Sequence, residues 1–173
     1  MSNRIDSYGL ARADLDDGHW LAHAKKLFSN ILLNANVAAT TTVDTTIVVP
    51  AGLEMHVLIG AEANQGMQTL TLLKDVTGTS GGSAVGSVNH SQLGTPKTTT
   101  VVVTKGVSGL TGGTLLFTKH IYGASNGPFQ NASSIRSSAE WILPAGTHAL
   151  RLVTGASAAN YVDIALEFYE VTS

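Results

Sequence analysis

The chain has 173 residues, enough for one domain with an arm but too few for two full domains. Its ten basic and twelve acidic side chains leave a formal net charge of −2, without the clusters of Lys and Arg that nucleic acid requires, so nucleic acid is disfavoured as a partner. Cysteine is absent, which excludes disulfides and a cysteine nucleophile, and no apolar run approaches the ~20 residues that span a bilayer, so we expect no membrane contact.

Residues 1–30 differ from the rest of the chain because they hold most of its charge density. In the stretch DLDDGHWLAHAKKLF, Leu21 and Phe28 recur in helical phase, with aspartates and lysines at the ends that suit a helix. We therefore predict an arm or short helix over 1–30, too polar at its start for a signal peptide. A lone helix this short is marginal in water, so it should dock on its own domain or on a partner. Its candidate contact residues are His19, Trp20 and Leu21.

From Leu27 onward the pattern becomes that of β-structure, and we assign 31–173 to one antiparallel β-sandwich domain. Apolar and polar residues alternate along 53–63 and 161–170, so each strand has one face toward the core and one toward water. No strand is followed by a convincing helical pattern, which disfavours a parallel α/β sheet. We place strands at 30–37, 44–49, 53–63, 67–74, 98–104, 114–122, 138–143, 147–154 and 161–170.

Two Gly- and Ser-rich stretches, 76–97 and 122–139, are predicted to be long loops outside the core. Loops of this length in a compact domain usually have a role or a partner, although each also suits a flexible connection. Phe129 stands alone as a large apolar residue in the second loop, which favours an anchoring contact there.

The tripeptide Pro-Ala-Gly occurs twice, at 50–52 and 144–146. Proline cannot continue a central ladder and glycine accepts backbone angles that other residues resist, so each occurrence is predicted to end one strand and precede another. The corners suit a chain that passes between two sheets or makes tight hairpins at similar rims. An ordinary turn used twice by chance is the alternative.

Motifs for catalysis or cofactor binding are weak in this sequence. Residues 78–82 match the G-x-S-x-G string, with Ser80 and His90 as a candidate nucleophile and base, but a nucleophile elbow needs a strand-to-helix turn and this loop precedes no helix. His19 and His23 would share one face of a helix, which suits a structural metal or, as we favour, a surface or interface pair. We therefore expect no enzyme activity, no metal and no cofactor. The other histidines are interpreted as exposed residues of strand faces: His56, His90, His120 and His148.

The C-terminal half resembles a known family. Its features are Arg136 ahead of Glu140 and Trp141, a Leu-Pro-x-Gly-Thr corner, an alternating Leu-Arg-Leu strand, and a closing strand that ends in Glu-Phe-Tyr-Glu. These features resemble the small β-sandwich virion proteins encoded beside the major capsid protein of tailed bacteriophages, described as head decoration, cement or head-fibre base proteins. The resemblance spans about residues 50–170, and Phe168 stands where that family usually has a tryptophan.

The resemblance implies a jelly-roll-like sandwich that binds the outer surface of a phage capsid, contacts the major capsid protein and stabilises the shell. It also implies synthesis in the host cytoplasm, a place on the virion and a homo-oligomer, for which a trimer is favoured. Trp141 is expected in the core or at a subunit seam, and Arg136 and Glu140 are expected to form an ion pair. These three residues and Phe129 join the arm as candidate capsid or subunit contacts.

The alternative is a carbohydrate- or receptor-binding module of a head fibre, tail fibre or spike, because β-sandwiches often surround sugar sites with exposed aromatic residues. Candidate aromatic residues are Trp20, Tyr122, Phe129 and Tyr161. Copy number separates the two functions, since a decoration protein covers the whole shell and a fibre protein is present in few copies.

Overall fold

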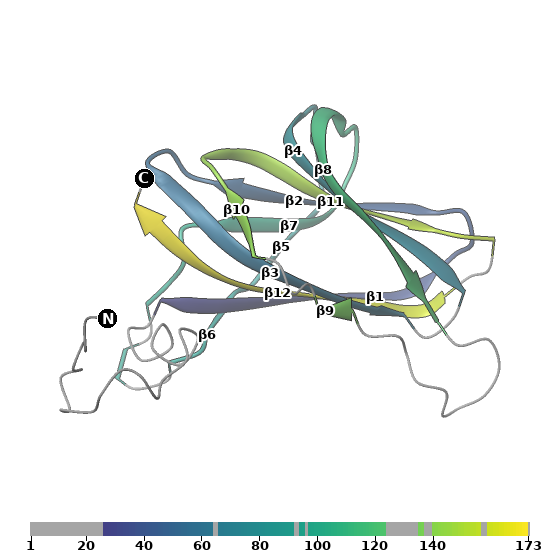
Figure 1. Ribbon diagram of the computed structural model, residues 1–173, viewed down its shortest axis with the longest axis horizontal. Helices are drawn as coiled ribbons and strands as arrows, with labels where there is room; N and C mark the ends of the chain where they lie inside the picture. The colour runs from purple at the N-terminus through teal and green to yellow at the C-terminus, as the bar shows by residue number, and fades with distance from the viewer. Residues whose placement is uncertain are drawn as a thin grey trace, which may run out of the picture.

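The computed structural model describes residues 26–63, 66–91, 94–95, 97–123, 135–136, 140–156 and 159–172. Within these residues the chain is all β and contains no helix. Its strands are β1 (Leu27–Val37), β2 (Thr42–Val49), β3 (Leu53–Ala63), β4 (Met67–Thr77), β5 (Ser83–Val85), β6 (Val88–Asn89), β7 (Val102–Val107), β8 (Thr111–Tyr122), β9 (Ile135–Arg136), β10 (Trp141–Leu143), β11 (Gly146–Thr154) and β12 (Ala159–Thr172). They form two antiparallel sheets packed as a β-sandwich, which confirms the predicted fold class (Figure 1).

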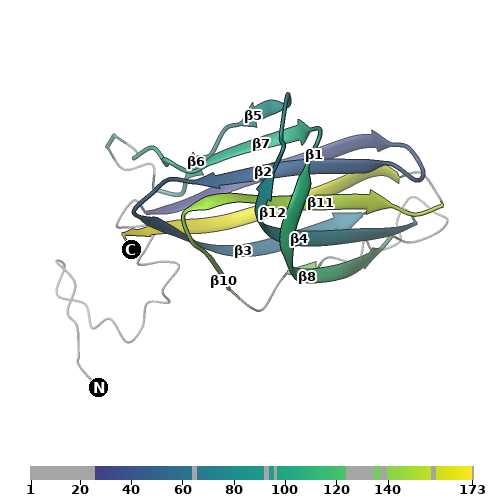
Figure 2. The ribbon, with the colours of Figure 1, turned by 90° about the horizontal axis from the view of Figure 1, so that it is seen from above.

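The strand order of the two sheets is nested. One sheet, called here the β3–β12–β1 sheet, has the order β10-β3-β12-β1-β6, with β9 also paired to β3. The other, the β2–β11–β4 sheet, has the order β5-β7-β2-β11-β4-β8. The first strand therefore pairs with the last and the second with the one before it, which is the double Greek-key arrangement of a jelly roll. Figure 2 shows the strands of the β2–β11–β4 sheet lying side by side in front of the other sheet.

The core lies between the sheets and follows from the alternation of apolar and polar residues along each strand. Every second residue is buried from Met55 to Ala63 in β3 and from Val162 to Phe168 in β12, and these side chains form one core with buried residues of β4 and β11 from the opposite sheet. Burial of apolar surface stabilises such a core by ~25 cal/mol per Å². The fully buried large side chains are Phe168, Leu32, Ile47, Met55, Leu70, Leu72, Ile121, Leu143, Leu150, Leu152, Ile164 and Leu166.

The first strand begins inside the segment that the sequence assigns to the arm. β1 starts at Leu27, and Phe28 is buried with its ring stacked on Phe168 at 5.6 Å between centroids. The predicted helical phase is therefore wrong at Phe28, because Phe28, Asn30 and Leu32 alternate inward as a strand. The rest of the arm, and the helix predicted for it, lie outside the described residues.

Both Pro-Ala-Gly corners carry the chain from one sheet to the other. Pro50 follows β2 and leads into β3, whereas Pro144 follows β10 and leads into β11. The two corners lie at the same rim, because Gly146 is paired with Val49. Gly52 has a φ of 79°, a left-handed angle that favours glycine. Of the alternatives that the sequence left open, the passage between sheets is the one realised.

The second corner is held from inside by a histidine. His148 is fully buried, and its Nε2–H donates a hydrogen bond of 2.8 Å to the carbonyl oxygen of Pro144. The prediction that His148 is exposed on a strand face is therefore wrong, whereas His90 and His120 are exposed. The ring satisfies a carbonyl that the turn leaves without a ladder partner, which is a local side-chain-to-backbone bond of the kind that stabilises turns.

An ion pair joins β2 and β11 on the outward side of the β2–β11–β4 sheet. Arg151 and Asp44 are directly opposite each other, and the guanidinium contacts both carboxylate oxygens, with Nε–Oδ1 and Nη2–Oδ2 distances of 2.8 and 2.9 Å. This hydrogen bonding raises the pKa of Arg151 above its ordinary value, while partial burial opposes the shift. The Leu-Arg-Leu pattern is thus explained, because Leu150 and Leu152 are buried and the arginine between them points outward.

The two edges of the sandwich differ. At one edge β5 pairs with β7 of one sheet and β6 pairs with β1 of the other, so that the short link between β5 and β6 crosses from sheet to sheet. Buried Asn30 holds this link, since its Nδ2 donates to the carbonyl oxygen of Gly86 and to Oγ of Ser87, each at 3.0 Å. The stretch 76–97 therefore contains two short strands that close this edge.

Replacing Asn30 with alanine should loosen this closed edge. We expect the free energy of unfolding to fall by about 1–3 kcal/mol, because the buried Asn30 side chain makes two hydrogen bonds to the link and each contributes about 0.5–1.5 kcal/mol. Chemical denaturation measures the change, and Ser29→Ala, which alters the outward face of the same strand, is the control. Equal destabilisation by the two variants would contradict the assignment of Asn30 as the residue that holds the link.

Candidate interaction site at the open edge and on the β3–β12–β1 sheet

The outward side of the β3–β12–β1 sheet carries carboxylates and is called here the acidic face. Glu54 and Glu62 come from β3 and Asp163 and Glu167 from β12, at positions that alternate with buried residues. Glu62 and Asp163 are directly opposite each other. Among the described side chains of β1, β3, β6, β10 and β12 there is no lysine or arginine. The described side chains of the face therefore carry charge of one sign, while the side chain of Arg136 in β9, which also pairs with β3, is not described. Like charges placed opposite each other destabilise a sheet until a cation approaches them.

Apolar side chains are exposed on the same face. Ile31 of β1, Val88 of β6 and Ile142 of β10 are 65%, 61% and 55% exposed, and Ala165 is exposed next to Ile31. Single exposed apolar residues are ordinary, but these lie on one side of one sheet together with the carboxylates. A surface with apolar side chains and charges of one sign suits a partner that offers apolar contacts and basic groups.

An aromatic cluster joins the acidic face to the edge where β10 ends one sheet and β8 ends the other, called here the open edge. His56 of β3 stacks on Tyr169 of β12 with ring centroids 4.7 Å apart, and His56 Nδ1 lies 3.0 Å from the Tyr169 hydroxyl. The Glu140 carboxylate lies 3.5 Å from the same nitrogen. Ile142 is next in this row, because it is paired with His56. The short strand β10 is thus fixed to β3 by side chains as well as by its ladder.

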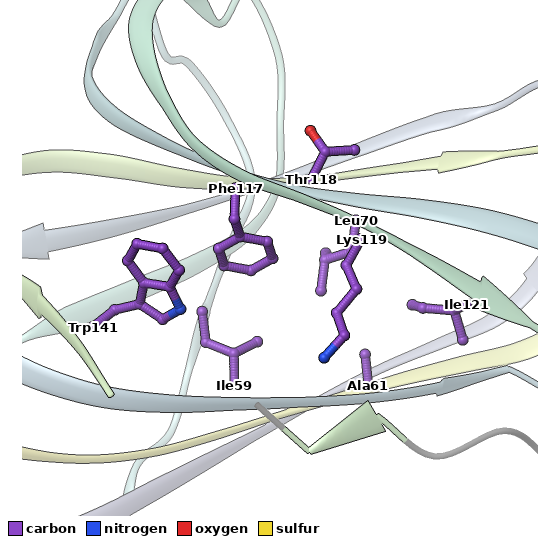
Figure 3. Close-up of a pocket in the computed structure, with 8 residues that line it drawn as sticks. All are labelled: Ile59, Ala61, Leu70, Phe117, Thr118, Lys119, Ile121 and Trp141. Carbon is purple, nitrogen blue, oxygen red and sulfur yellow. The ribbon is translucent and has the colours of Figure 1, made fainter. Parts of the chain in front are cut away.

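Trp141 points to the other side of β10, toward the gap between the sheets. Its ring stacks on Phe117 of β8 with centroids 5.2 Å apart, so it bridges the edges of the two sheets. It packs against the core while staying half-buried, and its place at a subunit seam stays a prediction. Next to this pair a pocket of about 260 Å³ opens between β3 and β8 (Figure 3).

The structure describes only some of the residues expected to make contacts. His19, Trp20, Leu21 and Phe129 lie outside the described residues, as does the pair His19 and His23. Arg136 is in β9, paired through its backbone with Gly60, while its side chain is not described, so its ion pair with Glu140 stays a prediction. Glu140 contacts His56. Arg136, Glu140 and Trp141 do line up along one margin of β3, through β9 and β10.

Sequence reasoning misses several residues of this region. His56 of β3 meets Tyr169 of β12 on the acidic face, and Phe117 and Lys119 of β8 line the pocket beside Trp141. Their sequence separation gives no sign of contact, and only the strand register brings them to one place. The usable signal is the alternation of β3 and β12, which separates inward from outward residues but does not say which strands are neighbours.

The motifs for chemistry gain no supporting geometry. Ser80 forms an isolated bridge with Ser108, their hydroxyl oxygens are 3.2 Å apart, and the chain after it continues into β5 rather than into a helix. In the part of the chain that the structure describes, no three His, Asp or Glu side chains gather to hold a metal ion. No described helix is long and apolar enough to cross a membrane.

Comparisons with known proteins leave the fold as the basis for classification. A scan against models of protein families gave no match, and searches of curated proteins and of solved structures gave none either. By its fold and surface the chain is a β-sandwich protein with an acidic, partly apolar face and one open edge.

Proposed function

We propose that this protein is a non-enzymatic virion component that binds the outer surface of a phage capsid and stabilises it. The observation that carries the proposal is the acidic face, where Ile31, Val88 and Ile142 are each more than half exposed beside carboxylates. The resemblance of the C-terminal half to head decoration proteins of tailed phages supports the same function. The partner is then the major capsid protein, through a surface with basic and apolar side chains.

Stabilisation of a shell needs only weak contacts if many copies act together. A homo-oligomer, for which we favour a trimer, presents several acidic faces to neighbouring capsid subunits at once. Each linked contact raises the effective concentration of the next, so overall avidity exceeds the affinity of one face. This mechanism requires no catalytic groups. The acidic face both binds the capsid and sets the orientation of the protein on it.

The proposal predicts that purified protein binds empty shells of the major capsid protein of the same phage. The double variant Ile31→Thr, Ile142→Thr should bind about 10-fold more weakly, because threonine keeps a β-branched side chain but removes apolar contact area. Added salt should weaken binding further, since exposed charges are screened. Co-sedimentation with shells over a range of protein and salt concentrations measures both effects.

The matched control changes exposed apolar residues of the other sheet. Val102 and Leu115 are 49% and 58% exposed, so Val102→Thr, Leu115→Thr removes similar area away from the acidic face. This control should bind shells as the unaltered protein does. Failure of the unaltered protein to bind shells would overturn the function, and equal weakening by the control would overturn the choice of face.

A carbohydrate- or receptor-binding module remains the second candidate. The observation that favours it is Tyr122, which is 58% exposed at the end of β8 with its ring near that of His120, at 6.4 Å between centroids. Exposed aromatic rings are common platforms for sugars. Densitometry of the virion proteins decides between the two functions, because decoration predicts a copy number that scales with the number of capsid subunits.

A further inference from the structure

The pocket at the open edge has one lysine among apolar walls. Its lining comes from β3, β4, β8 and β10, and Figure 3 shows Trp141 and Phe117 together at one end with the Lys119 side chain extending between β8 and β3. The hydroxyl of Thr118 points the other way. The residues that line the pocket are Ile59, Ala61, Leu70, Phe117, Thr118, Lys119, Ile121 and Trp141.

Lys119 occupies an inward position of its strand. It is paired with Leu70, which is buried, and its neighbours on the same side of β8 are Phe117 and Ile121. The inward side of β8 thus carries Phe, Lys and Ile in turn. An apolar side chain at position 119 would fill the space between the sheets, whereas Lys119 places an ammonium group there. A lysine stem can cover apolar surface while its ammonium group stays near water, which fits a half-buried residue at the mouth of a pocket.

The charge of Lys119 is uncompensated in the described part of the chain. Other carboxylates are engaged elsewhere, since Asp44 bonds Arg151 and Glu170 bonds the segment before β7. The acidic face lies on the far side of β3. No ion pair joins Lys119 to a described carboxylate. A cation in apolar surroundings favours an anion as its neighbour, because the attraction grows as water is excluded.

We propose that this pocket binds a small amphiphilic anion, with an aromatic or short aliphatic body against Trp141, Phe117 and Ile59 and a carboxylate or sulfonate at Lys119. An apolar cavity of ~150 Å³ holds benzene, so about 260 Å³ admits a fused two-ring system or a short alkyl chain. A sugar is disfavoured, because its hydroxyl groups would meet apolar walls and remain without hydrogen-bond partners. This inference concerns the open edge and stands independently of the acidic face.

The ligand would bridge the two sheets at the edge that β5 and β6 do not close. Its body would touch β3 and β10 from one sheet and β8 from the other. A ligand that binds only the folded state raises the melting temperature as its concentration exceeds Kd. Occupancy of this pocket would therefore stabilise the sandwich where it is open.

The test uses 2-naphthoate as the probe and 2-naphthalenemethanol as its neutral analogue. A Trp20→Phe background leaves Trp141 as the only tryptophan, since the chain has two, so quenching of its fluorescence reports on the pocket. We expect saturable quenching by 2-naphthoate and a rise in melting temperature. Lys119→Met should weaken 2-naphthoate binding about 10-fold or more and leave the neutral analogue unchanged, because a hydrogen bond to a charged group is removed.

Two further variants make the outcome decisive. Lys97→Met removes the charge of an exposed lysine away from the pocket and should change neither affinity. Ala61→Leu places a larger side chain in the pocket and should abolish binding of both probes, with melting curves establishing that it folds. Absence of saturable binding, or binding of 2-naphthoate that both Lys119→Met and Ala61→Leu leave intact, would overturn the proposal. Lys119→Met should bind capsid shells as the unaltered protein does. Failure of the pocket proposal is therefore distinguishable from failure of the proposed function.

Discussion

Replacement of Phe168 with alanine is expected to lower the free energy of unfolding by about 3–5 kcal/mol, the largest effect of any single change considered for this protein. Phe168 is fully buried on β12, and its ring stacks on Phe28 of β1. β12 lies between β1 and β3, so removal of the ring leaves a cavity that two neighbouring strands border. Partial collapse of the surroundings cannot restore the close packing that the ring provides on all its sides.

Denaturation in guanidinium chloride measures this destabilisation, provided that the slope of unfolding free energy against denaturant concentration is the same for both proteins. Val171→Ala is the matched control, because Val171 is on the same strand and 37% exposed, and it should cost less than ~1 kcal/mol. A decrease for Phe168→Ala no greater than that of the control would mean that the C-terminal strand does not carry the core. That result would contradict the nested strand order as well.

Replacement of Glu170 with alanine is expected to cost about 2–3 kcal/mol, because one carboxylate oxygen organises the crossing into β7. Glu170 Oε1 accepts hydrogen bonds from the backbone N–H groups of Thr100 and Val101, at 2.8 and 3.0 Å. The hydroxyl groups of Thr99 and Thr100 donate to the same oxygen. Removal of the side chain takes away the acceptor that these donors share where the chain changes sheets, and leaves the N–H of Val101 with Thr99 Oγ1 alone.

The amide carbonyl of glutamine can still accept some of these bonds. Glu170→Gln should therefore lose about half as much stability as Glu170→Ala, since hydrogen bonds to a charged acceptor are roughly twice as strong. Glu54→Ala removes a carboxylate from the acidic face and controls for net charge. Hydrogen exchange gives a local readout, because the amides of Thr100 and Val101 should exchange faster only in the Glu170 variants. Unchanged exchange at both amides would refute the role of Glu170.

These effects separate two parts of the resembling C-terminal motif. In the closing Glu-Phe-Tyr-Glu, Phe168 is a core residue and Glu170 ties down the segment before β7. Glu167 and Tyr169 alternate to the other side, where Tyr169 stacks on His56. Two residues of the motif, Phe168 and Glu170, therefore stabilise the interior of the sandwich, and the other two lie on the acidic face. A surface variant at Ile31 or Ile142 leaves all four in place, which lets shell binding be tested without loss of the fold.

Prediction from the sequence succeeds where a strand is long and alternates. The predicted bounds of β3 and β12 lie close to the observed ones, because eleven and fourteen residues give a two-residue period room to be seen. β5, β6 and β9 escape prediction, since two or three residues carry no period and their strand character comes from the neighbour they pair with. Phe28 fits a helical pattern in the sequence because a segment with few apolar residues is compatible with both the 3.6-residue period of a helix and the two-residue period of a strand.

The candidate sites show the same division. Trp141 and Glu140 stand out by their motif, yet the partners that give them a role, Phe117 and His56, lie on strands far away in the sequence. The exposure predicted for His148 is wrong because it lies on the same inward side of β11 as Leu150 and Leu152, whereas the prediction followed the polarity of histidine. The pocket could not be expected at all, since Lys119 is an ordinary polar residue until the register places it beside Leu70.

Local patterns in the chain are sufficient to specify an all-β sandwich with turns at the two Pro-Ala-Gly corners, because alternation and the chemistry of proline and glycine act over a few residues. Long-range packing settles which strands are neighbours, that both corners share one rim, and that one edge is closed while the other holds a pocket. The reason is physical: strand pairing is an interaction between residues far apart in the chain. The free energy of that pairing depends on the whole set of buried surfaces rather than on any local pattern.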